Sequence, residues 1–431
     1  MKKTLLIIFI LSFFKFAYAN DNLLFYVEAA LKNNPKLNAE RKNLKATQED
    51  INISRSEFLP SVTISGSQTS TESFNRTNET GAKLNDTNLN TETKSISIDQ
   101  KIFDGFQNYN SLKKSKLEEE KAKYKLKNIE QEIIFESSSA LYDLIFYTKN
   151  KNYNLLNVDL FERQVETDKA RLQKGEINLN DLAQSESSLA GANAELIKAE
   201  TNLLNAKTNF EKITRLSIPK EIDLNSKINL KLPISLNDAL KLADKNSPNL
   251  IIAKINSLIS EKELNIEKAK LSPKAALNYT KSENDDFSSS INSVDTESVK
   301  ATISWPIIKG GKNFSTIKKF IYKKDQNLLL FQEAENNTKS ETTNAWSNYQ
   351  SSEGILSATE AQLKAAEIAN EGITQEYDSG NTRTTLELIQ SRTLLLEARI
   401  SNAEAERNFT ISQFKLLSQI GGLTVNSLKT L

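Results

Sequence analysis

The residue types that most often carry enzyme chemistry are missing from this chain of 431 residues. It contains no His and no Cys, and its 12 Gly form no glycine-rich phosphate loop. The chain therefore lacks the usual general base near neutral pH, the commonest soft metal ligands, thiol nucleophiles and disulfides. We expect a protein that is not an enzyme and that uses no metal and no cofactor.

The charged residues give no binding signature either. Lys and Arg number 56 and Asp and Glu number 55, and both signs are mixed along the chain. A nucleic-acid-binding protein would concentrate basic residues on one surface or in one segment. We therefore expect no nucleic-acid partner, and we interpret most of the charge as solvating.

Residues 1–19 have the layout of a secretory signal peptide. Lys2 and Lys3 precede an apolar stretch from Leu5 to Phe14, and the small residues Ala17 and Ala19 follow it. The apolar stretch is too short to cross a bilayer, because a spanning helix takes about 20 residues. The mature chain is expected to begin near Asn20, with no later helix that spans a membrane.

The mature chain is expected to be an internal repeat. Two spacings in the first half recur in the second half. The spacing from Pro35 to Pro60 recurs from Pro248 to Pro273, and the spacing from Gly105 to Gly175 recurs from Gly310 to Gly380. The halves differ in length only between Pro60 and Gly105, where a Ser-, Thr- and Asn-rich segment is typical of a loop. We interpret the chain as a duplication.

The repeat sets the expected organisation of the chain. The first repeat covers residues 20–215, a linker covers 216–235, the second repeat covers 236–420, and a tail covers 421–431. Each repeat should contain helices, a strand hairpin, and a long helical hairpin. We place the strand hairpins at about 59–104 and 272–308 and the turns of the helical hairpins near 175 and 380.

Alternating segments in both halves predict half-buried strands. Apolar Val62 and Ile64 alternate with Thr63 and Ser65, and the same alternation runs from Ser298 to Trp305. Strands of this kind form the walls of membrane barrels, although a soluble hairpin with one wet face shows them too. The smallest membrane barrels have about eight strands, so four strands would have to be completed by other copies of the chain.

Two long segments without Pro, from Gly105 to Gly175 and from Gly310 to Gly380, predict continuous helices. At 1.5 Å per residue each would reach on the order of 100 Å. The returning segments carry ladders at steps of seven, which are Leu182, Leu189, Leu196, Leu203 and Phe210, and Leu388, Leu395, Asn402, Phe409 and Leu416. These ladders predict coiled-coil hairpins, and Gly175 and Gly380 are expected to end helices at positive φ.

Several segments of the chain resemble the TolC family of outer-membrane efflux proteins. They are residues 27–35, 100–105, 172–182, 236–243 and 377–388, which match the repeat openings, a strand exit and the two turns of the family. The resemblance implies a mainly α fold with a membrane β-barrel: a homotrimer with a long barrel of twelve helices, extending into the periplasm, and a twelve-stranded β-barrel in the outer membrane, four strands per protomer. It also implies a belt around the helices at the equator, where the linker would lie.

The resemblance further implies a function and partners. It makes the protein a passive export duct of a tripartite efflux or type I secretion system, in contact with outer-membrane lipid. A periplasmic adaptor and an inner-membrane transporter would open the duct at its periplasmic end. Two alternatives remain: a periplasmic coiled-coil interaction protein without a pore, and the adaptor itself.

By motif match, the family's gating residues fall on Asp181, Tyr377 and Arg383. In the family, the residues at these positions tie neighbouring coiled coils together, and a guanidinium can grip a carboxylate with two hydrogen bonds. A plainer interpretation is that Asp181 favours a helix N-terminus and that Arg383 is a solvated charge. The second turn is one residue longer than the first, which bears on the match at Arg383.

The resemblance also places a ring of acidic residues at the narrowest point of the pore. Its first position falls on Glu387, and its second falls on Gln390, where the family carries an acid. Carboxylate rings favour cations, so the change to Gln390 predicts weaker cation selectivity. The turns at Gly175 and Gly380 are the expected contacts for the adaptor.

Overall fold

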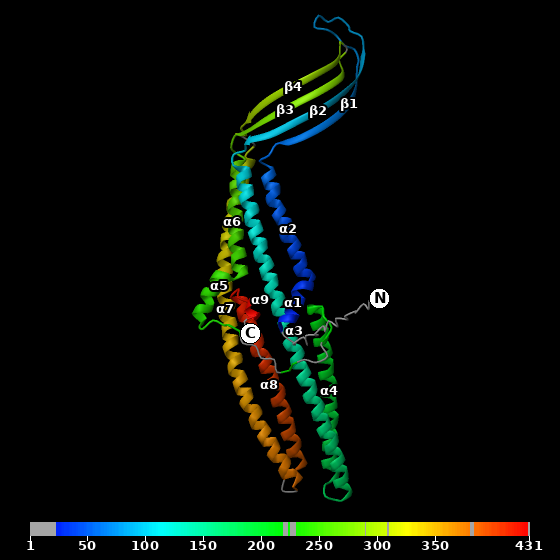
Figure 1. Cartoon of the computed structure of the whole chain (residues 1–431), viewed down its shortest axis with the longest axis vertical. Coiled ribbons are helices and arrows are strands. Elements are labelled where there is room, and N and C mark those ends of the chain that lie inside the picture. The colour runs from blue at the N-terminus through cyan, green and yellow to red at the C-terminus, as the bar shows by residue number, and fades with distance from the viewer. Residues whose placement is uncertain are drawn as a thin grey trace, which may run out of the picture. The chain divides into compact units, whose positions relative to one another are not determined.

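A computed structural model describes residues 23–218, 223–224, 230–288, 290–307, 310–379 and 383–429 (Figure 1). In chain order the described elements are α1 (Leu23–Asn33), α2 (Pro35–Ser56), β1 (Ser61–Ser73), β2 (Thr87–Phe103), α3 (Gln107–Gln173), α4 (Leu179–Thr214), α5 (Leu236–Asn246), α6 (Pro248–Ala269), β3 (Lys274–Ser288), β4 (Ile291–Ser304), α7 (Lys312–Asp378), α8 (Thr385–Gln419) and α9 (Val425–Lys429). Within these ranges, every helix is too short or too polar to cross a membrane. The proposed signal peptide lies outside the described residues.

The chain divides into two compact units, and both halves of the sequence contribute to each. Unit 1 is assigned Met1–Asn38, Ile129–Asn246 and Lys339–Leu431, and unit 2 is assigned Ala39–Asn128 and Ser247–Thr338. The helices α3 and α7 have 67 residues each and belong to both units. The interleaving follows from this continuity, because each long helix begins in unit 2 and ends in unit 1.

In unit 1 the apolar ladder of α4 packs as the sequence predicts. Val158 and Phe161 of α3 form a cluster with Ala192 of α4 and Ile389 of α8, and the ladder residues Leu189 and Leu196 pack against it. Two residues of the predicted ladder therefore lie against this apolar cluster. Because the cluster includes Ile389, it also joins the first helical hairpin to the second.

The ladder of α8 contains one polar residue, and the structure explains it. Leu388 and Leu416 are fully buried, and Asn402 lies between them with only 9% of its surface exposed. Its side-chain oxygen accepts a hydrogen bond from Thr359 Oγ1 of α7 at 3.3 Å. The polar interruption therefore forms a contact between the two helices of this hairpin.

Two ion pairs also connect the hairpins of unit 1, from α3 to α8. Arg407 Nε lies 2.5 Å from Asp143 Oδ1, and Lys149 Nζ lies 2.7 Å from Glu406 Oε2. The Lys149 side chain is only 15% exposed, so water screens its pair less than it screens a surface pair. Apolar and ionic contacts thus hold α3 and α8 side by side.

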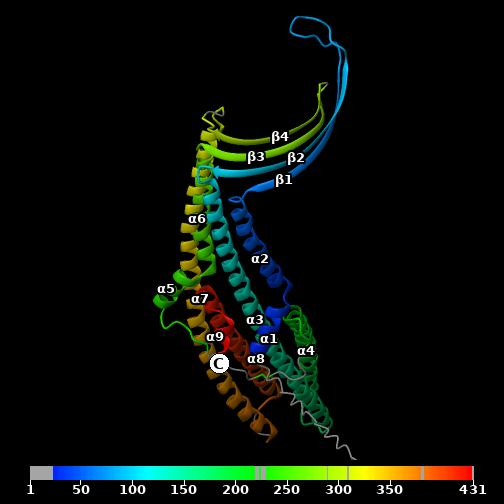
Figure 2. The same cartoon turned by 45° about the horizontal axis from the view of Figure 1, so that its top comes forward.

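Unit 2 contains a four-stranded antiparallel sheet in the order β1-β2-β3-β4. Figure 2 shows that the four strands curve together in one direction. The strands lie where the alternating segments predict them, so the strand prediction is confirmed. The outer strands β1 and β4 each have one edge without a neighbouring strand among the described residues.

The two faces of this sheet differ in chemistry. The register aligns Val62, Ile98, Tyr279 and Val299 in one row across all four strands. The adjacent row on the opposite face holds the hydroxyl residues Thr63, Ser97, Thr280 and Ser298. Val62 and Val299 are 64% and 71% exposed, so the apolar face lacks a cover within the described part of the chain. The next row on the same face aligns Ile64 and Ile96 with the charged Lys281 and Glu297, so only the apolar part of this face fits a lipid environment.

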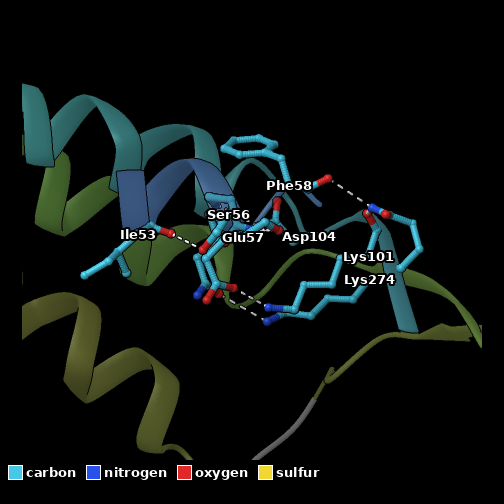
Figure 3. A network of polar contacts seen from close by, with 10 residues as sticks. Ile53, Ser56, Glu57, Phe58, Lys101, Asp104 and Lys274 are labelled. Atoms are coloured by element: carbon cyan, nitrogen blue, oxygen red, sulfur yellow. Dashed lines mark hydrogen bonds and ion pairs between the residues drawn. The ribbon is translucent and has the colours of Figure 1, made fainter. Parts of the chain in front are cut away.

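Polar contacts join the sheet of unit 2 to its helices (Figure 3). Lys101 of β2 forms an ion pair with Glu57, just after α2, with 2.5 Å between Nζ and Oε2. The carboxylate of Asp104 accepts a hydrogen bond from the backbone N–H of Asn108 at 2.7 Å. Asp104 thereby satisfies one of the free N–H groups at the start of α3, which fixes where the helix begins.

The turn between β2 and α3 requires glycine. Gly105 has φ +73°, and a Cβ there would lie 2.4 Å from Ser272 Cβ and 2.6 Å from the Ala269 carbonyl oxygen. The repeat-equivalent Gly310 has φ +54°, but a Cβ there would meet no heavy atom of the described residues within 4 Å. The glycine at position 105 is therefore structural, because a close backbone approach leaves no space for a side chain.

We expect Gly105→Ala to lower the apparent melting temperature, measured by circular dichroism in detergent, more than Gly310→Ala does. Both variants place a side chain at positive φ, which costs about 1–2 kcal/mol. Gly105→Ala must in addition displace backbone and Ser272, and overpacking of this kind costs about 1–3 kcal/mol. Equal losses in the two variants would contradict the role of the close approach.

Candidate functional site at the helical turns

The turn from α3 to α4 is a regular helix ending with glycine. Gly175 has φ +72°, its N–H bonds the Leu172 carbonyl at 3.0 Å, and the N–H of Glu176 bonds the Arg171 carbonyl at 2.9 Å. This pair of hydrogen bonds is the Schellman motif, so Gly175 ends α3 as the sequence predicts. The corresponding Gly380 lies outside the described residues.

Asp181 and Glu387 occupy the same position in the two repeats. Each is the third residue of its helix, and each closes a capping box, with Asn178 before α4 and with Thr384 before α8. The Asn178 N–H donates to Asp181 at 3.2 Å, and the Thr384 N–H donates to Glu387 at 2.8 Å. Both carboxylates therefore satisfy free N–H groups at the start of their own helices.

Arg383 holds two carboxylates at the second turn. Its Nε lies 2.6 Å from Glu376 Oε2, and its Nη1 lies 3.0 Å from Glu387 Oε1. The hydrogen bond from the Thr384 backbone, followed by the contact with Arg383, lowers the pKa of Glu387 below its usual range. Both carboxylates in turn raise the pKa of Arg383. The first residue of the expected acidic ring is thus paired with a cation of its own chain.

Tyr377 lies in a buried polar network with the carboxylate of Asp168 at its centre. The Tyr377 hydroxyl donates to Asp168 Oδ1 at 3.1 Å and lies 3.3 Å from Thr385 Oγ1. Gln164 Nε2 donates to both Asp168 and Tyr377 at 3.0 Å, and Ser185 Oγ donates to Asp168 at 2.5 Å. All five residues are at most 6% exposed. The network joins α3, α4, α7 and α8.

Two arginines extend this network. Arg392 of α8 donates from Nη1 to Gln164 Oε1 at 3.2 Å, and burial lowers its pKa. The guanidinium of Arg171 stacks over the Tyr377 ring, with 5.0 Å between its carbon and the ring centre. Such cation–π contacts add to the attraction between α3 and the end of α7.

The structure brings some of the predicted site residues together and keeps others apart. Arg383 and Glu387 form an ion pair, and Gln390 lies three residues further along α8, at an exposed position. Among the described residues, none of the hydrogen bonds or ion pairs joins Asp181 to Tyr377 or to Arg383. The carboxylate that meets Tyr377 within the chain is Asp168.

The sequence contains one indication that Asp168 is a candidate functional residue, and it lies outside the two turn motifs. Val158, Phe161 and Val165 are buried at coiled-coil spacing along α3, and Asp168 is the next residue in this series. A carboxylate at a core position of an apolar stripe must find hydrogen-bond donors on the facing helices. Its donors on α4 and α7 are distant in sequence, and no local pattern identifies them.

The described elements are two long helical hairpins and a four-stranded antiparallel sheet with an apolar row on one face. The chain belongs to the outer membrane efflux protein family, whose model matches residues 26–214 and 239–422. The protein is therefore an outer-membrane export channel that extends into the periplasm. This family membership favours the channel over a coiled-coil protein without a pore.

Individual relatives agree with this assignment. The outer membrane efflux protein BepC of Brucella suis is 24% identical over 404 residues, which are 93% of this chain and 85% of BepC. The outer membrane protein TolC of Escherichia coli is 22% identical, across 100% of this chain and 89% of TolC. The crystal structure of the CmeC outer membrane channel of Campylobacter jejuni has the same fold, with a TM-score of 0.82 and 15% identity over 93% of this chain and 86% of CmeC.

The capping role of Asp181 can be tested by hydrogen exchange. We expect Asp181→Ala to speed exchange of the Asn178 amide and its neighbours at the start of α4 by roughly fivefold, because loss of a cap costs about 1 kcal/mol. Asn180→Ala, at an exposed position of the same turn, serves as the matched control. Unchanged exchange in Asp181→Ala would show that its carboxylate does not stabilise the turn.

Proposed function

We propose that the protein works as a homotrimeric, passive duct that is closed at the helical turns at rest. The buried network around Tyr377 is the observation that carries this proposal. It links the ends of both helical hairpins through polar contacts, which a partner's groups can replace at lower cost than a continuous apolar core. A seal built from such contacts can open and close again.

The sheet supports association of three chains. Each chain offers four strands, two free edges and an apolar face. A free edge leaves backbone N–H and C=O groups unpaired, which is costly in lipid. Three copies would supply twelve strands, enough to close a barrel, with the apolar face toward outer-membrane lipid and the hydroxyl face toward water.

Energy for transport must come from other proteins, because the sequence has no phosphate-binding loop. We assign the opening of the duct to a periplasmic adaptor and an inner-membrane transporter that contact the turns at Gly175 and Gly380. In this arrangement the protein is the exit of a tripartite efflux or type I secretion system. The choice of substrate would lie with the transporter.

Within this proposal, Asp181, Tyr377 and Arg383 are the gating residues, and Glu387 with Gln390 lines the narrowest part of the pore. Arg383 already binds carboxylates of its own chain, so opening would require an exchange of ion-pair partners. Tyr377 would hold its hairpin in the closed position. Gln390 would leave the ring with a single acidic position per chain.

Single-channel recording in planar bilayers tests the proposed gate. We expect a small conductance from the wild-type protein and a much larger one from the double variant Tyr377→Phe with Arg383→Ser, because these changes remove the contacts of both side chains at the turns. Tyr322→Phe, a change of the same chemistry at an exposed position of α7, is the matched control. Absence of conductance from every protein, with no trimer in detergent, would refute the duct.

The ion selectivity of the pore should depend on Arg383. At neutral pH, Arg383→Ser removes a positive charge beside Glu387 and should increase cation preference, measured from the reversal potential in a KCl gradient. It should also raise the depressed pKa of Glu387 toward the ordinary value of about 4.3. On acidification, cation preference should therefore disappear at a higher pH in the variant than in the wild type. Gln390→Glu, which adds a second acid, should increase cation preference as a positive control.

A further inference from the structure

We propose that Asp168 is the acceptor through which Tyr377 holds the second helical hairpin against the first within one protomer, and that release of this contact is a step of opening. This inference rests on the proposed function and gives its gate a further residue. It differs from a gate whose only acidic partner is Asp181, because Asp181 caps its own helix while Asp168 accepts the Tyr377 hydroxyl.

The burial of Asp168 makes its contacts depend on one another. Its carboxylate is 0% exposed and accepts hydrogen bonds from three side chains on three helices: Gln164 of α3, Ser185 of α4 and Tyr377 of α7. A buried carboxylate is stable only while donors surround it, since it has no solvent to replace them. Moving α7 away therefore removes one donor and admits water to the group, so the network tends to hold or to release as a whole.

The position of Asp168 on α3 allows release without unfolding the hairpins. The apolar cluster of Val158, Phe161, Ala192 and Ile389 joins α3, α4 and α8 on the turns of α3 that precede Asp168. An apolar residue at position 168 would extend this cluster, and replacing buried polar groups by apolar ones often increases stability. A carboxylate at this position makes the contact near the turns more exchangeable than the contact before it.

Gln164 connects the carboxylate to a positive charge. Its Nε2 donates to Asp168 and to Tyr377, and its Oε1 accepts from Arg392, which also donates to the Leu160 carbonyl at 3.4 Å. The amide thus lies between a buried anion and a half-buried cation and is oriented by both. This orientation keeps its N–H groups directed at Asp168 and Tyr377, so Arg392 supports the contact without touching it.

A double-mutant cycle on the full-length protein tests the inference. The open-to-closed ratio is measured by single-channel recording for Asp168→Asn, Tyr377→Phe and the double variant. The amide in Asp168→Asn keeps the size of the side chain but loses one acceptor, which leaves a buried donor unsatisfied. We expect each single change to raise the ratio about tenfold, and the double variant to exceed the stronger single variant by less than about threefold.

A second cycle provides the matched control. Asp181→Asn is combined with Tyr377→Phe, and the two effects should multiply, because Asp181 and Tyr377 have separate partners within the chain. Ser185→Ala removes a different donor from Asp168 and should raise the ratio less than Asp168→Asn does. Elution of each variant as the wild-type oligomer in detergent shows that it is folded.

The outcomes separate the two proposals. If Asp168→Asn leaves the ratio unchanged, or if its effect multiplies with that of Tyr377→Phe, Asp168 is not the acceptor of the gate and the inference is wrong. If Tyr377→Phe itself leaves the ratio unchanged in a protein that conducts, the proposed gate fails instead. If Asp168→Asn fails to fold, the same coupling is measured between Ser185→Ala and Tyr377→Phe, and multiplying effects there overturn the inference.

Discussion

A helix of 67 residues has no globular core around it, so its apolar stripe must be covered by other helices along its whole length. The chain contains two such helices, α3 and α7, and the rest of the helical structure follows from this need. In unit 1, α4 and α8 return along them and bury the heptad ladders. In unit 2, α3 instead contacts α2 through Ser54 and Ser115 and contacts α6 through Lys114 and Glu263. The helix α3 thus changes its neighbours from one unit to the next.

The polar residues inside these apolar stripes are the points where the packing gains specificity. Asn402 accepts a hydrogen bond from Thr359 between α7 and α8, which favours one register of that hairpin. Asp168 has the same position in its stripe but accepts hydrogen bonds from its own helix and from α4 and α7. Asn402 therefore stabilises the packing of two helices within one hairpin, whereas the contacts of Asp168 depend on how the two hairpins pack against each other.

Sequence alone predicted those features whose cause lies within a few residues. The ladders at steps of seven, the alternating strands and the turn glycine Gly175 each follow from local periodicity or from backbone conformation, and the structure has them. The duplication made these signals stronger, because each landmark occurs twice. The capping role of Asp181 is also local, and it was the plainer of the two interpretations of that residue.

The buried network could not be predicted in the same way. Tyr377 and Asp168 are 209 residues apart, and their contact depends on how the two helical hairpins pack. A motif match points to Asp181 because that residue lies in the turn, whereas Asp168 lies earlier, within a helix. Only the apolar neighbours of Asp168 at coiled-coil spacing mark it as unusual, and they do not identify its partners.

The open edges of the sheet have a consequence for how the cell must make this protein. In the described part of the chain, β1 and β4 each have an unpaired edge, and one face of the sheet exposes apolar residues. Such a chain can pair with any exposed strand that it meets, including the wrong ones. Association of the subunits and their insertion into the membrane must therefore be coupled. A chain with a defective edge strand would inactivate each complex that it joins, including the intact copies in that complex.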